Sequence, residues 1–195
     1  MSLLAQLINA FQVLPGVGPK SAQRISFNLL QKNKQSAIQL AEILKQACEK
    51  IDECKRCRTL TENEYCRICD SSKRNTDQLC IVESPSDLMH IEQATDYSGT
   101  YFVLHGHLSP LDGIGPNELG FPKLVEILSK EPITEVIIAT NSTLEGETTA
   151  QYISQLCNKT NIKVTALAHG VPLGGELEYV NANTIAHAFG SRRSM

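Results

Sequence analysis

The sequence predicts an α+β protein built from several modules: an N-terminal helical module, a small four-cysteine module, an α/β domain with a parallel sheet, and a short C-terminal segment. Three observations support this fold class. Apolar residues recur at helical spacing up to residue 50, four cysteines then stand in two close pairs, and short β-rich apolar runs alternate with helical patterns from residue 79 onward. We place the modules at residues 1–52, 53–77, 78–172 and 173–195.

The first module is expected to contain three helices. The first begins behind Ser2, a favourable N-cap, and carries apolar residues at helical spacing: Leu3, Leu4, Leu7, Ile8 and Phe11. Pro19 favours the first turn of a second helix, because its missing N–H has no helical partner there. The apolar stripe of that helix is Ala22, Ile25 and Leu29. A third helix is expected near Ala37–Lys50.

The turn between the first two helices, Leu14-Pro-Gly-Val-Gly-Pro-Lys20, resembles a helix-hairpin-helix motif, which binds the DNA backbone without sequence preference. Gly16 and Gly18 permit unusual backbone angles and the close approach of a phosphate, which the N-terminus of the following helix attracts. Lys20 and Arg24 share the opposite face from the apolar stripe. We therefore expect Gly16, Gly18, Lys20 and Arg24 to contact DNA.

This turn has two other interpretations. An ordinary helical hairpin would leave Lys20 and Arg24 merely solvated, and a bare G-x-G favours that interpretation over a DNA site. A nucleotide-binding P-loop is a poor alternative, because G-x-x-x-x-G-K-[ST] is absent, although Gly18-Pro-Lys-Ser21 faintly resembles its end. The longer pattern of glycines, Lys20 and Arg24 favours DNA contact.

The second module is poor in apolar residues and has two matched cysteine pairs, Cys54-x-x-Cys57 and Cys66-x-x-Cys69. Four thiolates can converge tetrahedrally on one ion, and zinc prefers thiolate ligands. Such a closed site predicts one structural Zn²⁺ that supplies folding free energy. Two redox dithiols or an iron–sulfur centre remain alternatives. The other cysteines, Cys48, Cys80 and Cys157, are expected to be small buried hydrophobes.

Charge and hydropathy bear on the partners and the compartment. Residues 1–79 carry 12 Lys and Arg against 8 Asp and Glu, net +4, and residues 80–195 carry 6 against 13, net −7. DNA contact is therefore expected mainly in the first part, although small modules also differ in charge by chance. The sequence lacks a run of roughly 20 apolar residues and a signal-peptide pattern. We expect a soluble, cytoplasmic protein with no membrane partner.

The third module alternates strands and helices, as a parallel sheet with covering helices does. The expected strands are the runs LCIVE, YFVL, EVIIAT and KVTALA, and the expected helices lie near 86–94, 121–130 and 147–158. The stretch from His105 to Gly120 is long and rich in Gly and Pro, and a loop of that length in a compact domain is usually functional.

This module resembles a Toprim domain, the α/β module of topoisomerases, primases and some nucleases. Glu83 stands at the end of the first strand, and Asn141-Ser-Thr-Leu-Glu-Gly-Glu147 stands where catalytic Toprim domains have D-x-D-x-E-G-E. The aspartates that gather Mg²⁺ in those enzymes are replaced by Asn141 and Thr143, which carry no charge. The resemblance therefore implies a Toprim fold without an efficient catalytic metal site.

The remaining acidic residues leave several interpretations open. Glu83, Glu145 and Glu147 could hold a weak Mg²⁺ site, form a solvated acidic rim, or contact a protein partner. The pair His105-x-His107 could bind metal but is more often hydrogen-bonded loop structure. The tyrosines of the module have no sequence context that marks a catalytic nucleophile.

The whole chain resembles the RecR family of bacterial recombination mediators, because the three modules occur in this order and three linking stretches match: Gly106–Pro116, Ala139–Glu147 and Ala168–Glu178. The resemblance implies a non-catalytic, ring-shaped homotetramer, associated with the nucleoid, that acts with RecO and RecF to help load RecA onto DNA coated by single-strand-binding protein. It also implies that Glu145 faces RecO.

Two rival functions remain. The first is a Mg²⁺-dependent Toprim nuclease or topoisomerase-like enzyme, against which Asn141 and Thr143 count. The second is an interaction scaffold whose hairpin and cysteine module only join subunits. A scaffold predicts no salt-sensitive DNA binding, whereas phosphate contacts weaken as salt rises.

Overall fold

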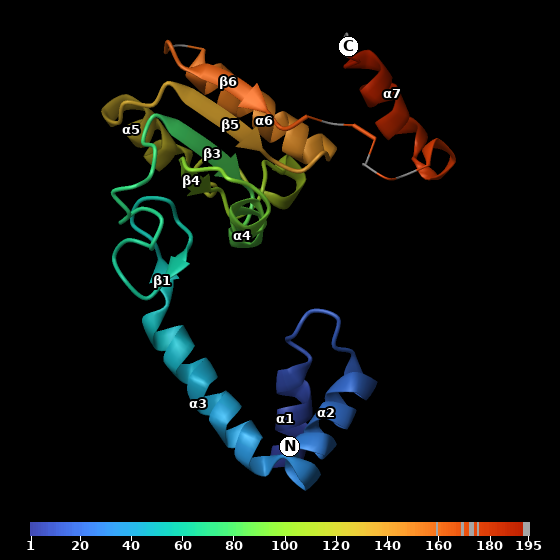
Figure 1. Cartoon of the computed structure of the whole chain (residues 1–195). Helices are drawn as coiled ribbons and strands as arrows, with labels where there is room; N and C mark the ends of the chain where they lie inside the picture. Colours follow the sequence, from blue (N-terminus) through green and yellow to red (C-terminus); the bar gives the residue numbers. More distant parts are fainter. Residues whose placement is uncertain (159, 169, 172–173, 175, 193–195) are drawn as a thin grey trace. The chain divides into compact units, whose positions relative to one another are not determined.

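The computed structural model describes residues 1–158, 160–168, 170–171, 174 and 176–192. The chain divides into two compact units, Met1–Asp52 and Glu53–Met195 (Figure 1). None of the described helices is both long enough and apolar enough to cross a membrane.

The first unit consists of α1 (Leu3–Phe11), α2 (Pro19–Lys32) and α3 (Lys34–Lys50). The Ser2 side chain accepts a hydrogen bond from the amide of Ala5, and Pro19 occupies the first turn of α2, so both predicted helix starts are confirmed. α2 packs against α1 through the face that buries Ala22. The third helix begins at Lys34, three residues before the predicted start.

The apolar face of α3 is left uncovered within its unit. Its side chains Ile38, Ile43 and Leu44 are exposed, and no residue of the helix is buried. The expectation that Cys48 is buried was therefore wrong, because its side chain lies on this exposed helix. The predictions for Cys80 and Cys157 are confirmed, since both are buried.

The second unit begins with a two-stranded sheet, β1 (Asp52–Glu53) and β2 (Leu60–Thr61), which carries the four-cysteine segment. A four-stranded sheet follows in the order β4-β3-β5-β6, and its strand pairs are parallel, as predicted. The strands are β3 (Gln78–Val82), β4 (Thr100–Val103), β5 (Glu135–Ala139) and β6 (Lys163–Ala166).

The helices of this unit are α4 (Pro85–Ala94), α5 (Phe121–Lys130), α6 (Leu144–Cys157) and α7 (Ala182–Gly190), with short 3-10 turns at Pro110–Asp112 and Leu177–Tyr179. The helix α6 begins three residues earlier than predicted, because the Thr143 side chain accepts a hydrogen bond from the Gly146 amide and caps it. The predicted motif Ala168–Glu178 lies partly outside the described residues.

Two apolar clusters cover the two faces of the four-stranded sheet. One joins alternate strand residues, such as Ile81 and Phe102, to α5 and α6. The other joins Val82 and Val103 to Leu88 of α4 and to the cysteine segment. The four-cysteine segment therefore packs on the sheet as a second covering element beside α4.

Candidate functional site

The turn between α1 and α2 exposes the N-terminus of α2. Gly16 has a left-handed backbone angle (φ +78°), and the amide of Val17 donates to the carbonyl of Leu14 at 3.1 Å. Gly18 is the N-cap of α2 and, lacking a side chain, makes no side-chain capping bond. The first amides of α2 therefore have no intrahelical acceptor and can bind an anion.

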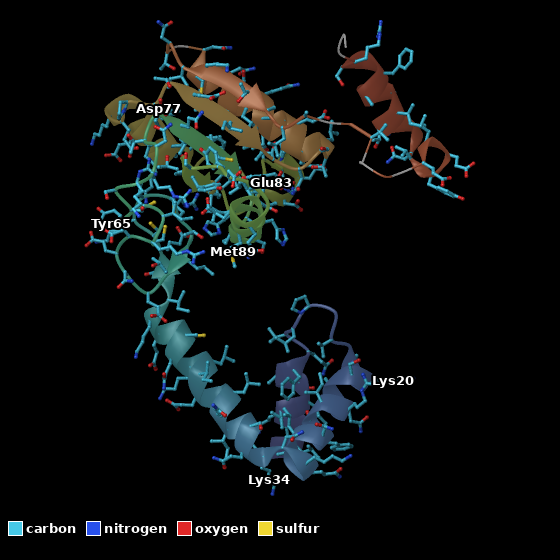
Figure 2. All side chains as sticks on the ribbon, in the orientation of Figure 1. Lys20, Lys34, Tyr65, Asp77, Glu83 and Met89 are labelled. Atoms are coloured by element: carbon cyan, nitrogen blue, oxygen red, sulfur yellow. The ribbon has the colours of Figure 1, made fainter. Side chains whose placement is uncertain are left out.

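The outer face of α2 brings Lys20 and Arg24 together. Both side chains are exposed, and Lys20 projects away from the helix pair (Figure 2). A groove of about 430 Å³ runs along this face, and it includes five residues that the sequence analysis did not single out. The groove is lined by Lys20, Gln23, Arg24, Phe27, Asn28, Gln31 and Lys32.

The four predicted cysteines converge. The sulfur atoms of Cys54, Cys57, Cys66 and Cys69 lie within 4.8 Å of one another, and all but Cys69 are buried. Cys54 is held at a tight turn, in which its amide donates to the carbonyl of Thr59 at 2.7 Å. All seven cysteines of the chain are free thiols. This is a metal site by geometry and donor chemistry.

Hydrogen bonding within the cluster separates the pKa values of its thiols. The sulfur atoms of Cys57 and Cys66 are 3.5 Å apart, and their hydrogen bond lowers the pKa of Cys66 while it raises the pKa of Cys57. A bound cation would favour the thiolate form of the ligands.

Arginine side chains attach the cysteine segment to the sheet. The guanidinium of Arg56 pairs with Glu131 after α5 and donates to Thr100 at 3.1 Å. The guanidinium of Arg58 donates to the carbonyl of Leu104 at 3.3 Å. The edge strand β4 also donates from the Val103 amide to the carbonyl of Cys57 at 2.9 Å. The metal site is therefore continuous with the larger fold.

At the carboxyl end of the sheet, Glu83 is buried and hydrogen-bonded. Its side chain accepts hydrogen bonds from the backbone amide of Asn141 at 2.8 Å and from the Asn141 side-chain amide at 2.7 Å. Glu83 is only 6% exposed to solvent. The neutral amide of Asn141 thus donates to the carboxylate that would otherwise face a metal ion.

The structure explains why glycine and acidic residues occur in the Asn141–Glu147 stretch. A Cβ atom on Gly146 would come within 2.1 Å of the Asn141 carbonyl oxygen, so only glycine fits there. Glu145 and Glu147 are exposed in the first turn of α6, where the helix dipole favours negative charge. Among the residues that the structure describes, the four cysteines are the only group of three or more His, Cys, Asp or Glu side chains close enough to share a metal ion.

The histidine pair and the tyrosines do not form a reactive centre. The ring of His105 lies 2.7 Å from the Arg58 carbonyl, whereas His107 faces Glu83 at 3.4 Å, so the two rings have separate loop partners. Burial raises the pKa of both Tyr97 and Tyr101, which makes their hydroxyls poor nucleophiles.

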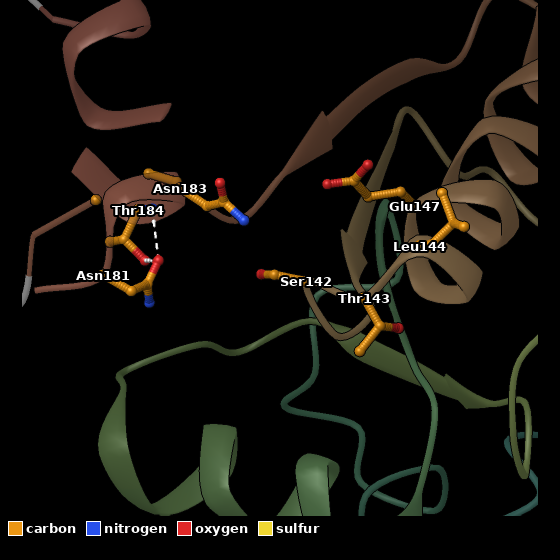
Figure 3. Close-up of a pocket in the computed structure, with 9 residues that line it drawn as sticks. Ser142, Thr143, Leu144, Glu147, Asn181, Asn183 and Thr184 are labelled. Carbon is orange, nitrogen blue, oxygen red and sulfur yellow. Dashed lines mark hydrogen bonds between the residues drawn. The ribbon is translucent and has the colours of Figure 1, made fainter. Parts of the chain in front are cut away.

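A cavity of about 710 Å³ lies by the N-terminus of α6 (Figure 3). Its lining is polar apart from Leu144 and small residues, and Glu147 is its charged member. Asn181 in this lining caps α7, because its side chain accepts from the Thr184 amide at 2.9 Å. We assign no ligand to this cavity.

Four family models match the chain. They are the RecR helix-hairpin-helix model at residues 4–48, the RecR zinc finger domain with four cysteine ligands at 51–71, the Toprim domain at 77–168 and the RecR C-terminal model at 170–193.

Curated relatives match over nearly their full length. "Recombination protein RecR" of Xanthomonas campestris pv. campestris (strain 8004) is 54% identical over 191 residues, which are 98% of this chain and 97% of the relative. The protein of the same name from Hydrogenovibrio crunogenus is 52% identical, over 99% of this chain and 98% of the relative.

Proposed function

This chain belongs to the RecR family of recombination proteins, and from that premise we propose that it is a DNA-binding mediator of recombinational repair. In this proposal it acts with RecO and RecF in the cytoplasm, at the nucleoid, and helps to load RecA onto single strands coated by single-strand-binding protein. The observation that carries the proposal is the pairing of Lys20 and Arg24 in one groove beside the open N-terminus of α2.

DNA contact through Gly16, Gly18, Lys20 and Arg24 is supported by sterics and charge. A Cβ atom on Gly18 would meet nothing within 4 Å in the described chain, and its backbone angle is one that any residue adopts. Packing within the unit therefore does not require this glycine, whereas a phosphate resting on the α2 amides does. Lys20 and Arg24 stand where they can neutralise such a phosphate.

We infer that the metal is one structural Zn²⁺ held by Cys54, Cys57, Cys66 and Cys69. Zinc bound at about 2.3 Å from each sulfur in a tetrahedron separates the sulfurs by about 3.8 Å, and the four sulfurs already lie within 4.8 Å of one another. Four protein thiolates leave no open position for a substrate. The bound ion would stabilise the fold rather than take part in a reaction.

The acidic edge of the sheet is proposed as a partner surface, with Glu145 and Glu147 as the contacts. Both side chains are exposed. Glu83 is proposed to support this surface rather than to contact the partner. Its carboxylate is buried and accepts two hydrogen bonds from Asn141, so it cannot readily reach another protein. Its contribution would be to hold the Asn141–Thr143 turn from which α6 starts.

Assembly into a ring-shaped homotetramer is the remaining part of the proposal. Exposed apolar side chains on α1 and α3, including Leu3, Ile38 and Leu44, support it. Large apolar side chains that stay exposed within a single chain can be covered by another copy of it. Molar mass from light scattering would measure the assembly.

Family membership favours this function over a Toprim nuclease or topoisomerase, and the chain is a non-catalytic recombination protein. The Glu83–Asn141 pair agrees with this assignment, since Asn141 donates where an enzyme needs a metal-binding carboxylate.

The proposal is tested by measuring DNA affinity and DNA integrity together. The double variant Lys20→Ala with Arg24→Ala should bind both single-stranded and duplex DNA at least about 10-fold more weakly than wild type, whatever the sequence. Wild type should leave the DNA intact in Mg²⁺. A double variant Lys45→Ala with Lys50→Ala, which removes two cations from α3, is the matched control.

Unchanged affinity in the Lys20/Arg24 variant would contradict the DNA site. Cleavage by wild type that disappears in Glu83→Gln would restore the enzyme alternative.

A further inference from the structure

The groove on α2 is longer than a contact to one phosphate requires. At about 100° per residue, Lys20, Arg24, Phe27 and Gln31 fall within about 60° of one another, so they form one line along the helix. The buried residues Ala22 and Ser26 lie on the opposite side. The line runs from Lys20 to Gln31, and Lys32 lines the same end of the groove to one side of the line.

The charge around this line has one sign. Residues 1–41 contain Lys20, Arg24, Lys32 and Lys34 and no Asp or Glu. The ion pairs found among the described residues join other side chains, and none of them uses these four cations. A cationic groove without acidic residues complements a polyanion.

An aromatic side chain stands in the middle of the groove. Phe27 is 39% exposed although α2 has a buried face on which it could have packed. It lies three residues after Arg24, so the two side chains are neighbours on the helix surface. A phosphate held by Arg24 would therefore bring the attached nucleotide within reach of the Phe27 ring.

We propose that Phe27 is a stacking platform for an unpaired base, and that the α2 groove is a binding site for single-stranded DNA. The inference rests on the proposed function, because Lys20 and Arg24 hold the strand in both. It adds a basis for discriminating between DNA forms, which backbone contacts alone do not provide.

The physical reason for discrimination is the availability of the base. Every base has a π-face that can stack on an aromatic ring, so such a platform tolerates any sequence. In a duplex the faces are already stacked on neighbouring base pairs, and extruding a base breaks its stacking and its pairing. The same groove therefore gains a contact from a single strand that it cannot gain from an intact duplex.

The test is the affinity of the full chain for an oligothymidylate strand and for a duplex of equal length, both at low salt. Phe27→Ala should weaken binding to the single strand by about 5- to 100-fold and change duplex binding by less than about 2-fold. Phe27→Leu, which keeps an apolar side chain without a π-face, should resemble Phe27→Ala. Phe27→Tyr should restore the affinity.

A strand with abasic sites removes the partner of the ring instead of the ring. Wild type should bind this strand as weakly as Phe27→Ala binds the intact strand, and the variant should lose nothing further on the abasic strand. The chain contains no Trp, so Phe27→Trp introduces a single tryptophan whose emission can be excited selectively. Its emission should be quenched by the single strand and not by the duplex.

The matched control is Leu30→Ala, because Leu30 is 40% exposed on the same helix and lies outside the groove. It should bind both DNA forms as wild type does. Thermal unfolding and molar mass of each variant establish that the fold and the assembly are intact.

Four results would overturn the inference. They are equal weakening of single-strand and duplex binding in Phe27→Ala, full affinity in Phe27→Leu, additive losses on the abasic strand, and a changed molar mass that identifies Phe27 as a subunit contact. Failure of wild type to bind either DNA at low salt would contradict the proposed function itself, and the Lys20/Arg24 variant distinguishes that case.

Discussion

Two charged regions of this molecule, the outer face of α2 and the carboxyl end of the parallel sheet, are built in opposite ways. On α2, Lys20 and Arg24 are exposed in a region of 41 residues without an acidic side chain. At the carboxyl end of the parallel sheet, Glu83 is buried and its carboxylate accepts two hydrogen bonds from Asn141. The first arrangement leaves charge available to a ligand, and the second holds the carboxylate in hydrogen bonds within the chain.

The difference shows why the α/β domain, although its fold resembles that of an enzyme module, lacks the metal-binding carboxylates of such enzymes. A metal site needs carboxylates that remain free to bind a cation, and Asn141 and Thr143 instead donate to Glu83 and cap α6. The exposed cations need no such preorganisation, because phosphate attraction acts over about 10 Å at moderate salt. We therefore propose that DNA binding belongs to the small helical unit.

The largest effect is expected at the cysteine cluster, which lies in the chain between the two regions. Cys57→Ser should release the metal and lower the free energy of unfolding by roughly 5 kcal/mol or more, because the site supplies folding energy that its surroundings lack. Metal content and hydrogen exchange across residues 52–72 measure this. Cys48→Ser, on the exposed face of α3, is the control and should retain the metal. A full metal complement in Cys57→Ser would refute the site.

An intermediate effect is expected when a second carboxylate is placed beside Glu83. Asn141→Asp replaces a donor to Glu83 with a second carboxylate, and the repulsion should cost about 1–3 kcal/mol of stability at pH 7. Adding Mg²⁺ should recover part of that loss in the variant and leave wild type unaffected. Chemical denaturation with and without Mg²⁺ is the measurement.

Asn117→Asp, an exposed change of the same type, should be neutral. Equal stability of Asn141→Asp and wild type would show that the Glu83–Asn141 bonds do not stabilise this edge.

The smallest effect is expected at the ion pair between Arg74 and Glu92, which ties the cysteine segment to α4. Burial alone would raise the pKa of Glu92, but Arg74, the Tyr101 hydroxyl and the charge of Arg67 together outweigh burial, so the pKa is lowered. A carboxyl whose pKa is lower in the folded state stabilises the fold above its unfolded pKa of about 4.3. This contribution disappears as the pH falls through the lower folded value.

Glu92→Gln should therefore be less stable than wild type by about 1 kcal/mol at pH 7, and the difference should narrow as the pH falls below about 4. Thermal unfolding across that range tests it. A constant difference at every pH would mean that the charge of Glu92 does not stabilise the fold.

Local signals predicted the helices and strands well. Ser2 and Pro19 placed the starts of α1 and α2, and the alternating apolar runs predicted the parallel sheet. The start of α6 was predicted too late. The Asn141–Glu147 stretch was interpreted as a metal-binding motif that has lost two ligands, whereas Thr143 in fact caps the helix.

Long-range features could not be predicted in the same way. The Glu83–Asn141 bonds join residues 58 positions apart, and the exposure of Cys48 follows from the uncovered position of α3 within its unit. The spacing of Arg24 and Phe27 was visible in the sequence. Only the structure showed that Phe27 lines a groove on the exposed face, since an aromatic residue on an amphipathic helix is usually buried.

The most direct test of the central claim, that DNA binds the acid-free face of α2 and not the acidic edge of the sheet, is the salt dependence of DNA affinity. The slope of log affinity against log salt should become shallower by about 1.4–1.8 in the Lys20→Ala, Arg24→Ala variant, because each lost phosphate contact removes about 0.7–0.9. It should be unchanged in Glu145→Gln with Glu147→Gln. A wild-type slope in the Lys20/Arg24 variant, or a shallower slope in the Glu145/Glu147 variant, would contradict the account.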